Sequence, residues 1–209
     1  MRIITISREF GSGGRELGKR MADILGFDYY DSEIISAVAE NSGFDEHYVE
    51  TTLDNHGWQS FPITFQSTLA SSAYIHSNKL ELLLEQKKVI EQIAEIGKDC
   101  IIVGRNADVL LKNHNPFNIF VCASKEAKIK RCMSRANADE KVSESAMSRK
   151  IKRIDRARAH TRAILSNSVW GDRSQYHITV NTTDWDIKNM ANHISNLALS
   201  WFGEDNENM

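Results

Sequence analysis

The fold is predicted mainly by one N-terminal segment, Arg2-Ile-Ile-Thr-Ile-Ser-Arg-Glu-Phe-Gly-Ser-Gly-Gly-Arg15. Its β-branched first half predicts a buried strand over residues 2–7, and the glycines predict a turn into a helix over residues 15–25 that ends at Gly26. In such a turn the glycines let backbone amides converge on an anion, and the helix N-terminus adds partial positive charge. The stretch therefore predicts a phosphate site at the first strand–helix turn.

Two registers of a P-loop compete in this stretch. Residues 13–19 match G-x-x-x-x-G-K, but Arg20 stands where Ser or Thr belongs, and the match lies inside the helix, so we interpret it as coincidental. In the better register the loop begins at Arg8. The predicted phosphate-binding residues are then Gly11, Ser12, Gly13, Gly14 and Arg15. Arg15 supplies the cation that the missing lysine would bring. The alternative is a glycine turn that serves only helix–sheet packing.

Strand-like and helix-like segments alternate along the rest of the chain. Further strands are predicted at residues 27–31, 100–103, 117–122 and 176–180. Helices are predicted at residues 32–40 (with Ser32 as N-cap), 45–53, 79–96, after Ser124, about 147–165, and 187–201. Because the strands are apolar on both faces, we expect one α/β domain over residues 1–202, with a mainly parallel sheet covered by helices. The acidic residues 203–209 are predicted to be a disordered tail.

The composition excludes several classes of protein. A chain of 209 residues with 41% hydrophobic and 26% charged residues is neither wholly disordered nor fibrous. It has no apolar run long enough to cross a bilayer and no signal pattern at its N-terminus. Its three cysteines fit neither a disulfide framework nor a paired metal motif. We therefore expect a cytoplasmic protein without a membrane partner.

Positive charge is concentrated in one region. Residues 125–162 hold thirteen Lys/Arg against five Asp/Glu, in a chain whose net charge is −2. This predicts either an anionic partner or a solvated helical face. Two arginine stripes lie there at helical spacing: Arg149, Arg153 and Arg156, and then Arg158 and Arg162.

Arginine suits phosphate because its planar fork binds two oxygens at once. Phosphoryl transfer needs positioned cations, so we predict basic lid helices at about 125–165. The predicted catalytic residues are Arg15, Arg149, Arg153 and Arg156. Nucleic acid would also satisfy these charges, but no platform of interleaved aromatic residues accompanies them, which ranks it lower.

Four segments together resemble the cytidylate kinase-like group of the nucleoside monophosphate kinases. They are Ile4-Thr-Ile-Ser-Arg-Glu-Phe-Gly-Ser-Gly-Gly-Arg15, Phe27-Asp-Tyr-Tyr-Asp-Ser32, Ile102-Val-Gly-Arg-Asn106 and Ile154-Asp-Arg-Ala-Arg158, in the family's order and spacing. The resemblance implies a P-loop NTPase-like three-layer sandwich with a helical substrate-binding insert at about 42–98 and an arginine-rich lid. It also implies ATP as phosphoryl donor, Mg²⁺, and a nucleoside monophosphate, CMP or dCMP, as acceptor.

The resemblance also implies a set of substrate-binding residues. They are Ser32, Lys79, Arg105, Asn106, Asp155 and Arg158. Asn106 stands where the family has an acid that reads the base, so base preference differs. Simpler interpretations stay open: Ser32 as only a helix N-cap, Lys79 as a solvated residue, and Asp155 with Arg158 as a surface ion pair.

Two positions depart from the family pattern. Val103 stands at the position of an Asp that helps hold Mg²⁺, and Ala37 stands at a substrate-phosphate arginine position. No protein ligand for the metal is identified. These departures leave two alternatives open, a nucleotide-binding module that has lost catalysis and a kinase for another small acceptor. The apolar residues of 58–74 predict either an acceptor-pocket lining or a homodimer contact.

Overall fold

The computed structural model describes the chain except for residues 55–67, 136–141 and 204–209. Within the described ranges, five parallel strands form one sheet in the order β2-β3-β1-β4-β5. The strands are β1 (Ile3–Arg8), β2 (Asp28–Tyr30), β3 (Cys100–Val103), β4 (Phe117–Cys122) and β5 (Ile178–Asn181). The apolar run that begins the chain thus becomes the central strand, because it is buried along its whole length.

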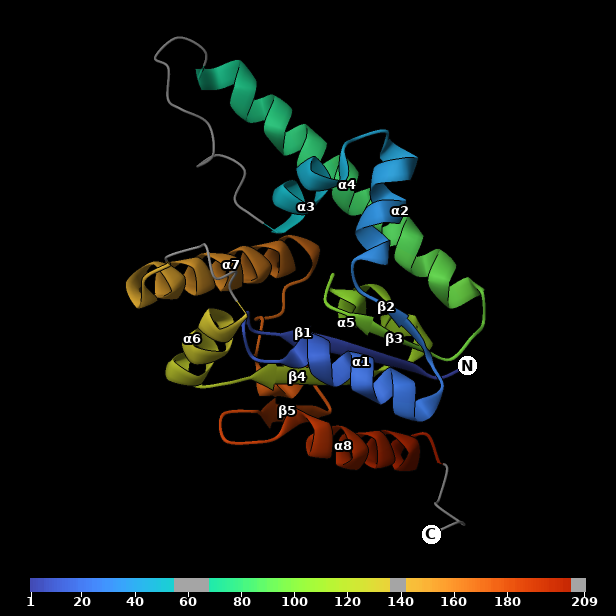
Figure 1. The fold of residues 1–209 in the computed structure, drawn as a ribbon. Helices are drawn as coiled ribbons and strands as arrows, with labels where there is room; N and C mark the ends of the chain where they lie inside the picture. Colours follow the sequence, from blue (N-terminus) through green and yellow to red (C-terminus); the bar gives the residue numbers. More distant parts are fainter. Residues whose placement is uncertain (55–67, 136–141, 204–209) are drawn as a thin grey trace.

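Helices cover both faces of this sheet (Figure 1). Those in the described ranges are α1 (Gly14–Leu25), α2 (Glu33–Ser42), α3 (Glu46–Asp54), α4 (Thr68–Glu95), α5 (Ala107–Leu110), α6 (Lys125–Ser134), α7 (Glu144–Leu165) and α8 (Ile187–Trp201). One apolar core joins α1 and α8 to the sheet, and a second joins α2, α3, α4 and α5 to its other face. The expected three-layer sandwich with a parallel sheet is confirmed.

Capping residues explain where several helices begin and end. Gly26 has a left-handed backbone (φ 67°), and its amide closes α1 on the carbonyl of Ala22, as predicted. The Ser124 hydroxyl caps α6 by accepting from the Ala127 amide at 3.1 Å. Ser32 is different, because its side chain makes no capping hydrogen bond to α2. Ser32 therefore occupies the N-cap position of α2, as predicted, and only its backbone carbonyl bonds to the first turn of the helix.

The structure also differs from prediction in the lengths of two elements. α4 begins at Thr68 rather than near Lys79, and β5 begins at Ile178, after a short 3-10 turn over Arg173–Gln175. The apolar stretch 58–74 falls partly on residues outside the described ranges, and its proposed roles stay predictions, as does the disordered tail. None of the helices in the described part of the chain combines the length and apolarity that a bilayer crossing requires.

Candidate functional site

The loop between β1 and α1 lies at the carboxyl edge of the central strand and is fixed from inside. The Glu9 amide extends the pairing with β4 by donating to the Val121 carbonyl at 2.9 Å. The Ser12 hydroxyl donates to the Glu9 carbonyl at 2.8 Å, and the Thr182 hydroxyl donates to the Ser12 carbonyl. Ser12 is completely buried, so its side chain shapes the loop and does not face solvent.

Close packing and backbone conformation both require the loop glycines. Gly11 and Gly13 have φ of 78° and 85°. A Cβ on Gly11 would lie 2.7 Å from the Cys132 sulfur, and one on Gly14 would lie 2.6 Å from the Cβ of Arg8. The packing explanation therefore holds, yet among the described residues the amides of Gly11, Gly13 and Gly14 have no hydrogen-bond acceptor. These amides remain available to an anion.

A cavity, here called the loop cavity, opens above this loop. Its walls come from the loop, α6 and α7, and its lining residues are Arg8, Glu9, Phe10, Gly11, Gly13, Gly14, Arg15, Arg131, Cys132, Arg135, Val142, Met147, Lys150 and Arg158. Six of these side chains are cationic and one is acidic. Arg131 also ties α6 to the loop, because its guanidinium donates to the Gly11 carbonyl at 2.7 Å and to the Thr182 carbonyl at 3.2 Å. The cavity therefore favours an anion.

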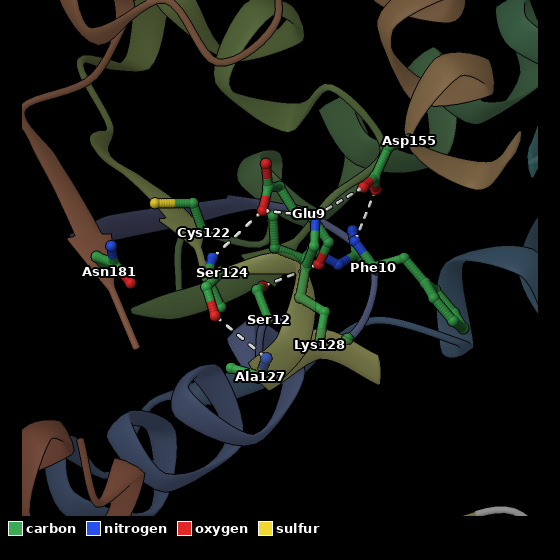
Figure 2. Close-up of polar contacts among 12 residues, drawn as sticks. Glu9, Phe10, Ser12, Cys122, Ser124, Ala127, Lys128, Asp155 and Asn181 are labelled. Carbon is green, nitrogen blue, oxygen red and sulfur yellow. Dashed lines mark hydrogen bonds and ion pairs between the residues drawn. The ribbon is translucent and has the colours of Figure 1, made fainter. Parts of the chain in front are cut away.

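A buried lysine joins the loop to α7 (Figure 2). The Lys128 amine lies 2.9 Å from Glu9 and 3.4 Å from Asp155. The Phe10 amide donates to the same Asp155 carboxylate at 2.7 Å. Burial alone lowers the pKa of Lys128, but its contacts with Glu9 and Asp155 outweigh burial and raise it. This lysine neutralises two carboxylates at the base of the loop.

Burial changes the pKa of Asp155, a partner of Lys128, in the opposite direction. It raises the pKa of Asp155, against the lowering effect of the Phe10 amide, Lys128 and Arg158. In this structure Asp155 docks α7 onto the loop, and its role in substrate binding stays a prediction.

A second cavity, here called the strand-end cavity, lies beside the carboxyl end of β3. Its lining residues are Ser7, Arg8, Leu53, Gln86, Gly104, Arg105, Asn106, Arg158, Thr161 and Trp170. The turn at its base has three successive left-handed residues, Gly104, Arg105 and Asn106, with φ of 79°, 57° and 54°. Such a backbone is costly for the two residues that carry side chains, and it occurs preferentially at functional sites. The turn is held by Gln86, which donates to the Arg105 carbonyl at 3.1 Å.

Arg8 and Arg158 line both cavities. Arg8 is the last residue of β1, and its guanidinium lies 3.2 Å from the buried Asp31 at the end of β2. Arg158 comes from α7 and donates to the Arg8 carbonyl at 2.8 Å. Arg15, on the first turn of α1, also pairs with Asp31. The two cavities therefore meet at arginines from β1 and α7, and Arg15 adds a third arginine to the loop cavity alone.

The structure brings together many of the residues predicted from sequence. Arg15 and the loop glycines line the loop cavity, Arg105 and Asn106 line the strand-end cavity, and Arg158 lines both. Ser32 is exposed, in a third cavity between α1, α2 and α3 that also includes Arg15 and Arg105. Lys79 is half-buried on α4 and lies outside the linings of these three cavities.

The arginines of α7 are divided between solvent, cavity and core. Arg149, Arg153 and Arg156 are exposed and do not line the cavities, so their catalytic role stays a prediction. Arg162 was expected to extend a lid stripe, and that expectation is wrong. It is 2% exposed and paired with Asp108, and its guanidinium donates to the Ser168 hydroxyl at 2.7 Å. Arg162 therefore anchors α7 to the core.

Four polar residues of the site were missed from sequence: Arg8, Glu9, Asp31 and Lys128. One signal could have found two of them. Arg8 and Asp31 each follow an apolar run at the point where a strand ends, and ligands bind outside the carboxyl ends of parallel strands. Lys128 gave no such signal, because it resembles the other lysines of a basic helix.

The described side chains do not fit the magnesium ion that the resemblance implies. They contain no group of three or more His, Cys, Asp or Glu that could hold a metal. Val103 is fully buried, the Ser12 hydroxyl is turned inward, and Glu9 is already paired with Lys128. The chain therefore offers no ligand set of the kind Mg²⁺ prefers in the described part of the loop cavity.

The strand order, the glycine turn and the cationic cavities define a P-loop kinase-like α/β protein. The chain belongs to the cytidylate kinase-like family, whose model matches residues 3–184. Family and fold together support the class of nucleotide or small-molecule kinases. A search of curated proteins gives no match.

Solved structures share the fold. An uncharacterized protein from Eubacterium ventriosum ATCC 27560 is 24% identical, with 98% of this chain and 100% of that chain covered and a TM-score of 0.68. A shikimate kinase from Acinetobacter baumannii in complex with shikimate is 14% identical, with 96% and 94% covered and a TM-score of 0.52. A shikimate kinase from Bacteroides thetaiotaomicron is 14% identical, with 94% and 97% covered and a TM-score of 0.55. At these identities the likeness shows the fold.

Proposed function

We propose that the protein is a kinase that transfers the γ-phosphoryl group of ATP to a nucleoside monophosphate, CMP or dCMP. The observation that carries the proposal is the meeting of two cavities at Arg8 and Arg158, one above a glycine loop and one at the end of β3. A phosphoryl-transfer enzyme needs two such sites in contact, because donor and acceptor oxygens must approach in line.

In this proposal the loop cavity takes the triphosphate of ATP. The amides of Gly11, Gly13 and Gly14 bind phosphate oxygens, and Arg15 supplies the charge that a P-loop lysine brings elsewhere. The strand-end cavity holds only about 30 Å³, so the acceptor extends from it into the third cavity, of about 360 Å³, with Arg105, which lines both, on its phosphate and Asn106 on its base. The chemistry is positioning and charge stabilisation, without a covalent intermediate. Arg149, Arg153 and Arg156 belong to a lid that approaches the bound polyphosphate.

Turnover tests the proposal directly. We expect ADP release with ATP to depend on one of CMP, dCMP, UMP or AMP, and Arg15→Ala to lower that turnover strongly. Arg173→Gln is the matched control, since Arg173 is exposed and lies outside the cavity linings. A folded wild-type protein that turns over none of these acceptors would contradict the proposal.

A second candidate is a nucleotide-binding module without catalysis. The inward Ser12 hydroxyl and the poor fit to Mg²⁺ favour it. Calorimetry separates the two candidates. Tight ATP binding that is independent of Mg²⁺ and accompanied by no turnover supports the module, whereas turnover with any acceptor removes it.

A third candidate is a kinase for a small acceptor other than a nucleotide. Ala37 packs against the apolar core and brings no charge to the acceptor's phosphate. A screen that adds small hydroxylated and phosphorylated metabolites to the nucleotides tests this candidate, since a metabolite turned over faster than every nucleotide would favour it.

A further inference from the structure

The guanidinium of Arg8 has an unusual position for a charged group at the end of a central strand. Arg8 is 8% exposed, yet it lines both the loop cavity and the strand-end cavity. Its guanidinium lies beside Gly104 of the strand-end cavity, and its Cβ lies beside Gly14 of the loop cavity. The loop cations Arg15 and Arg131 line the loop cavity but not the strand-end cavity.

Two features hold the Arg8 side chain in place. Its Nη2 atom lies 3.2 Å from the Asp31 carboxylate, which is itself 3% exposed. On the other side, the guanidinium fills the space beside Gly104, where a Cβ would lie only 1.4 Å from Nη1. Gly104 is thus a glycine for two reasons, its φ of 79° and the arginine that lies against it. Such preorganisation is what stabilisation of a transition state requires.

We infer that Arg8 is a catalytic residue whose guanidinium contacts the phosphoryl group during transfer, and that Asp31 is its positioning residue. This inference rests on the proposed function. In the step, an oxygen of the acceptor phosphate forms a bond to the γ-phosphorus, and the bond between that phosphorus and the β,γ-bridging oxygen of ATP breaks. ADP leaves with that electron pair.

No proton has to be removed in this step. The second pKa of a phosphate monoester is about 6, so the acceptor oxygen is already ionised near neutral pH. Arg8 stays protonated throughout, because a guanidinium does not lose its proton in proteins. Its contribution is fixed positive charge at the position where negative charge is spread over the transferring oxygens.

The test compares Arg8→Lys and Arg8→Ala with the surface control Arg173→Gln. We expect Arg8→Lys to bind ATP with a Kd close to that of the wild type, while kcat falls on the order of 10²- to 10³-fold. KM for the acceptor changes little, since the lost contact is made in the transition state. We expect added guanidinium ion to restore part of the turnover of Arg8→Ala, whose truncated side chain leaves space for it.

A structural role for Arg8 would give different results. If Arg8→Lys keeps the wild-type kcat, or loses activity only through a higher KM, the inference is overturned. Failure of guanidinium to rescue a folded Arg8→Ala that binds ATP also counts against it. A wild-type protein that neither binds ATP nor turns over any acceptor contradicts the proposed function itself, and the two failures are therefore distinguishable.

Asp31→Asn tests the positioning role. We expect kcat to fall on the order of tenfold with an unchanged Kd for ATP, because the guanidinium of Arg8 is less tightly held. A wild-type kcat in a folded Asp31→Asn variant would remove Asp31 from the inference.

Discussion

Two buried arginine–aspartate pairs lie near the carboxyl end of β1, and they differ in what surrounds them. Arg162 and Asp108 are 2% and 6% exposed, and neither lines the loop cavity or the strand-end cavity. Arg8 and Asp31 are as well buried, but Arg8 lines both cavities. Burial and pairing are therefore alike in the two pairs, and access to a cavity distinguishes the pair that we propose to act in catalysis from the pair that joins α7 to the core.

The partners of the two pairs support this distinction. Around Arg162, protein groups satisfy the charge: Asp108 also accepts from the Ser7 hydroxyl, at 3.3 Å, and the guanidinium lies 5.7 Å from the Tyr176 ring centroid. Asp31, in contrast, is shared between two arginines that both reach the loop cavity, Arg8 and Arg15. The comparison predicts a loss of stability in one case and a loss of catalysis in the other.

The largest effect on stability is expected at the structural pair. Arg162→Met leaves the Asp108 carboxylate buried without its cation, which costs about 3–5 kcal/mol of unfolding free energy. Urea denaturation measures this loss. The double variant Arg162→Met/Asp108→Leu should be more stable than Arg162→Met alone, because no buried charge remains. A loss below about 1 kcal/mol, the range of a surface ion pair, would contradict the structural assignment.

Lys128 is a third buried charged residue. It pairs with two carboxylates at the base of the β1–α1 loop. Lys128→Met should cost about 3 kcal/mol near neutral pH, because Glu9 and Asp155 lose their shared cation. The pKa of Asp155 is already raised by burial, and it rises further without Lys128.

The sign of the pH dependence follows from this raised pKa. A carboxylate whose pKa is higher in the folded state stabilises the fold below its unfolded pKa, near 3.8, and that contribution is lost as pH rises through the folded value. The penalty of Lys128→Met should therefore shrink as pH falls from 7 toward this range. Urea denaturation of variant and wild type across these pH values is the measurement. A penalty independent of pH would show that the Lys128 contacts are not electrostatic.

Gly104→Ala tests the position of Arg8 in a second way, and a matched control exists. Gly43 has a similar φ, 72° against 79°, but its Cβ position has no neighbour within 4 Å. Both alanine variants should lose about 1–2 kcal/mol from the left-handed backbone. Gly104→Ala should in addition displace the Arg8 guanidinium and lower kcat, whereas Gly43→Ala should keep the wild-type kcat. Equal kcat values in the two variants would separate Gly104 from the catalytic arrangement.

The smallest effects on stability are expected on the exposed face of α7. The triple variant Arg149→Gln/Arg153→Gln/Arg156→Gln should change the unfolding free energy by less than about 0.5 kcal/mol, as surface substitutions do. If these arginines act on ATP as predicted, its association rate should fall about tenfold at low salt and less at high salt. Stopped-flow binding at two ionic strengths measures this. An unchanged association rate would remove the steering role.

The sequence was informative where a residue's environment depends on its neighbours in the chain. The strand over residues 2–7, the caps at Gly26 and Ser124, and the glycine turn all follow from local pattern, and the structure confirms them. The positions of Arg105 and Asn106 beside a cavity followed from their place after a buried strand.

The sequence does not predict which side chains meet when they are far apart in the chain. Lys128 meets Glu9 over 119 residues of chain, and Arg162 meets Asp108 over 54. Arg158 and Arg162 lie one turn apart on α7, yet one lines cavities and the other is anchored in the core. The packing of α7 against the sheet decides this difference, and helical periodicity alone does not carry that information.

The central claim is that the free amides of the β1–α1 loop hold the phosphates of a nucleotide. Titration of the protein with ATP, followed by amide resonances in solution NMR, tests it most directly. We expect large shifts for Gly11, Gly13 and Gly14, and none for Gly43 at the end of α2. Loop resonances that stay unmoved at saturating ATP would contradict it.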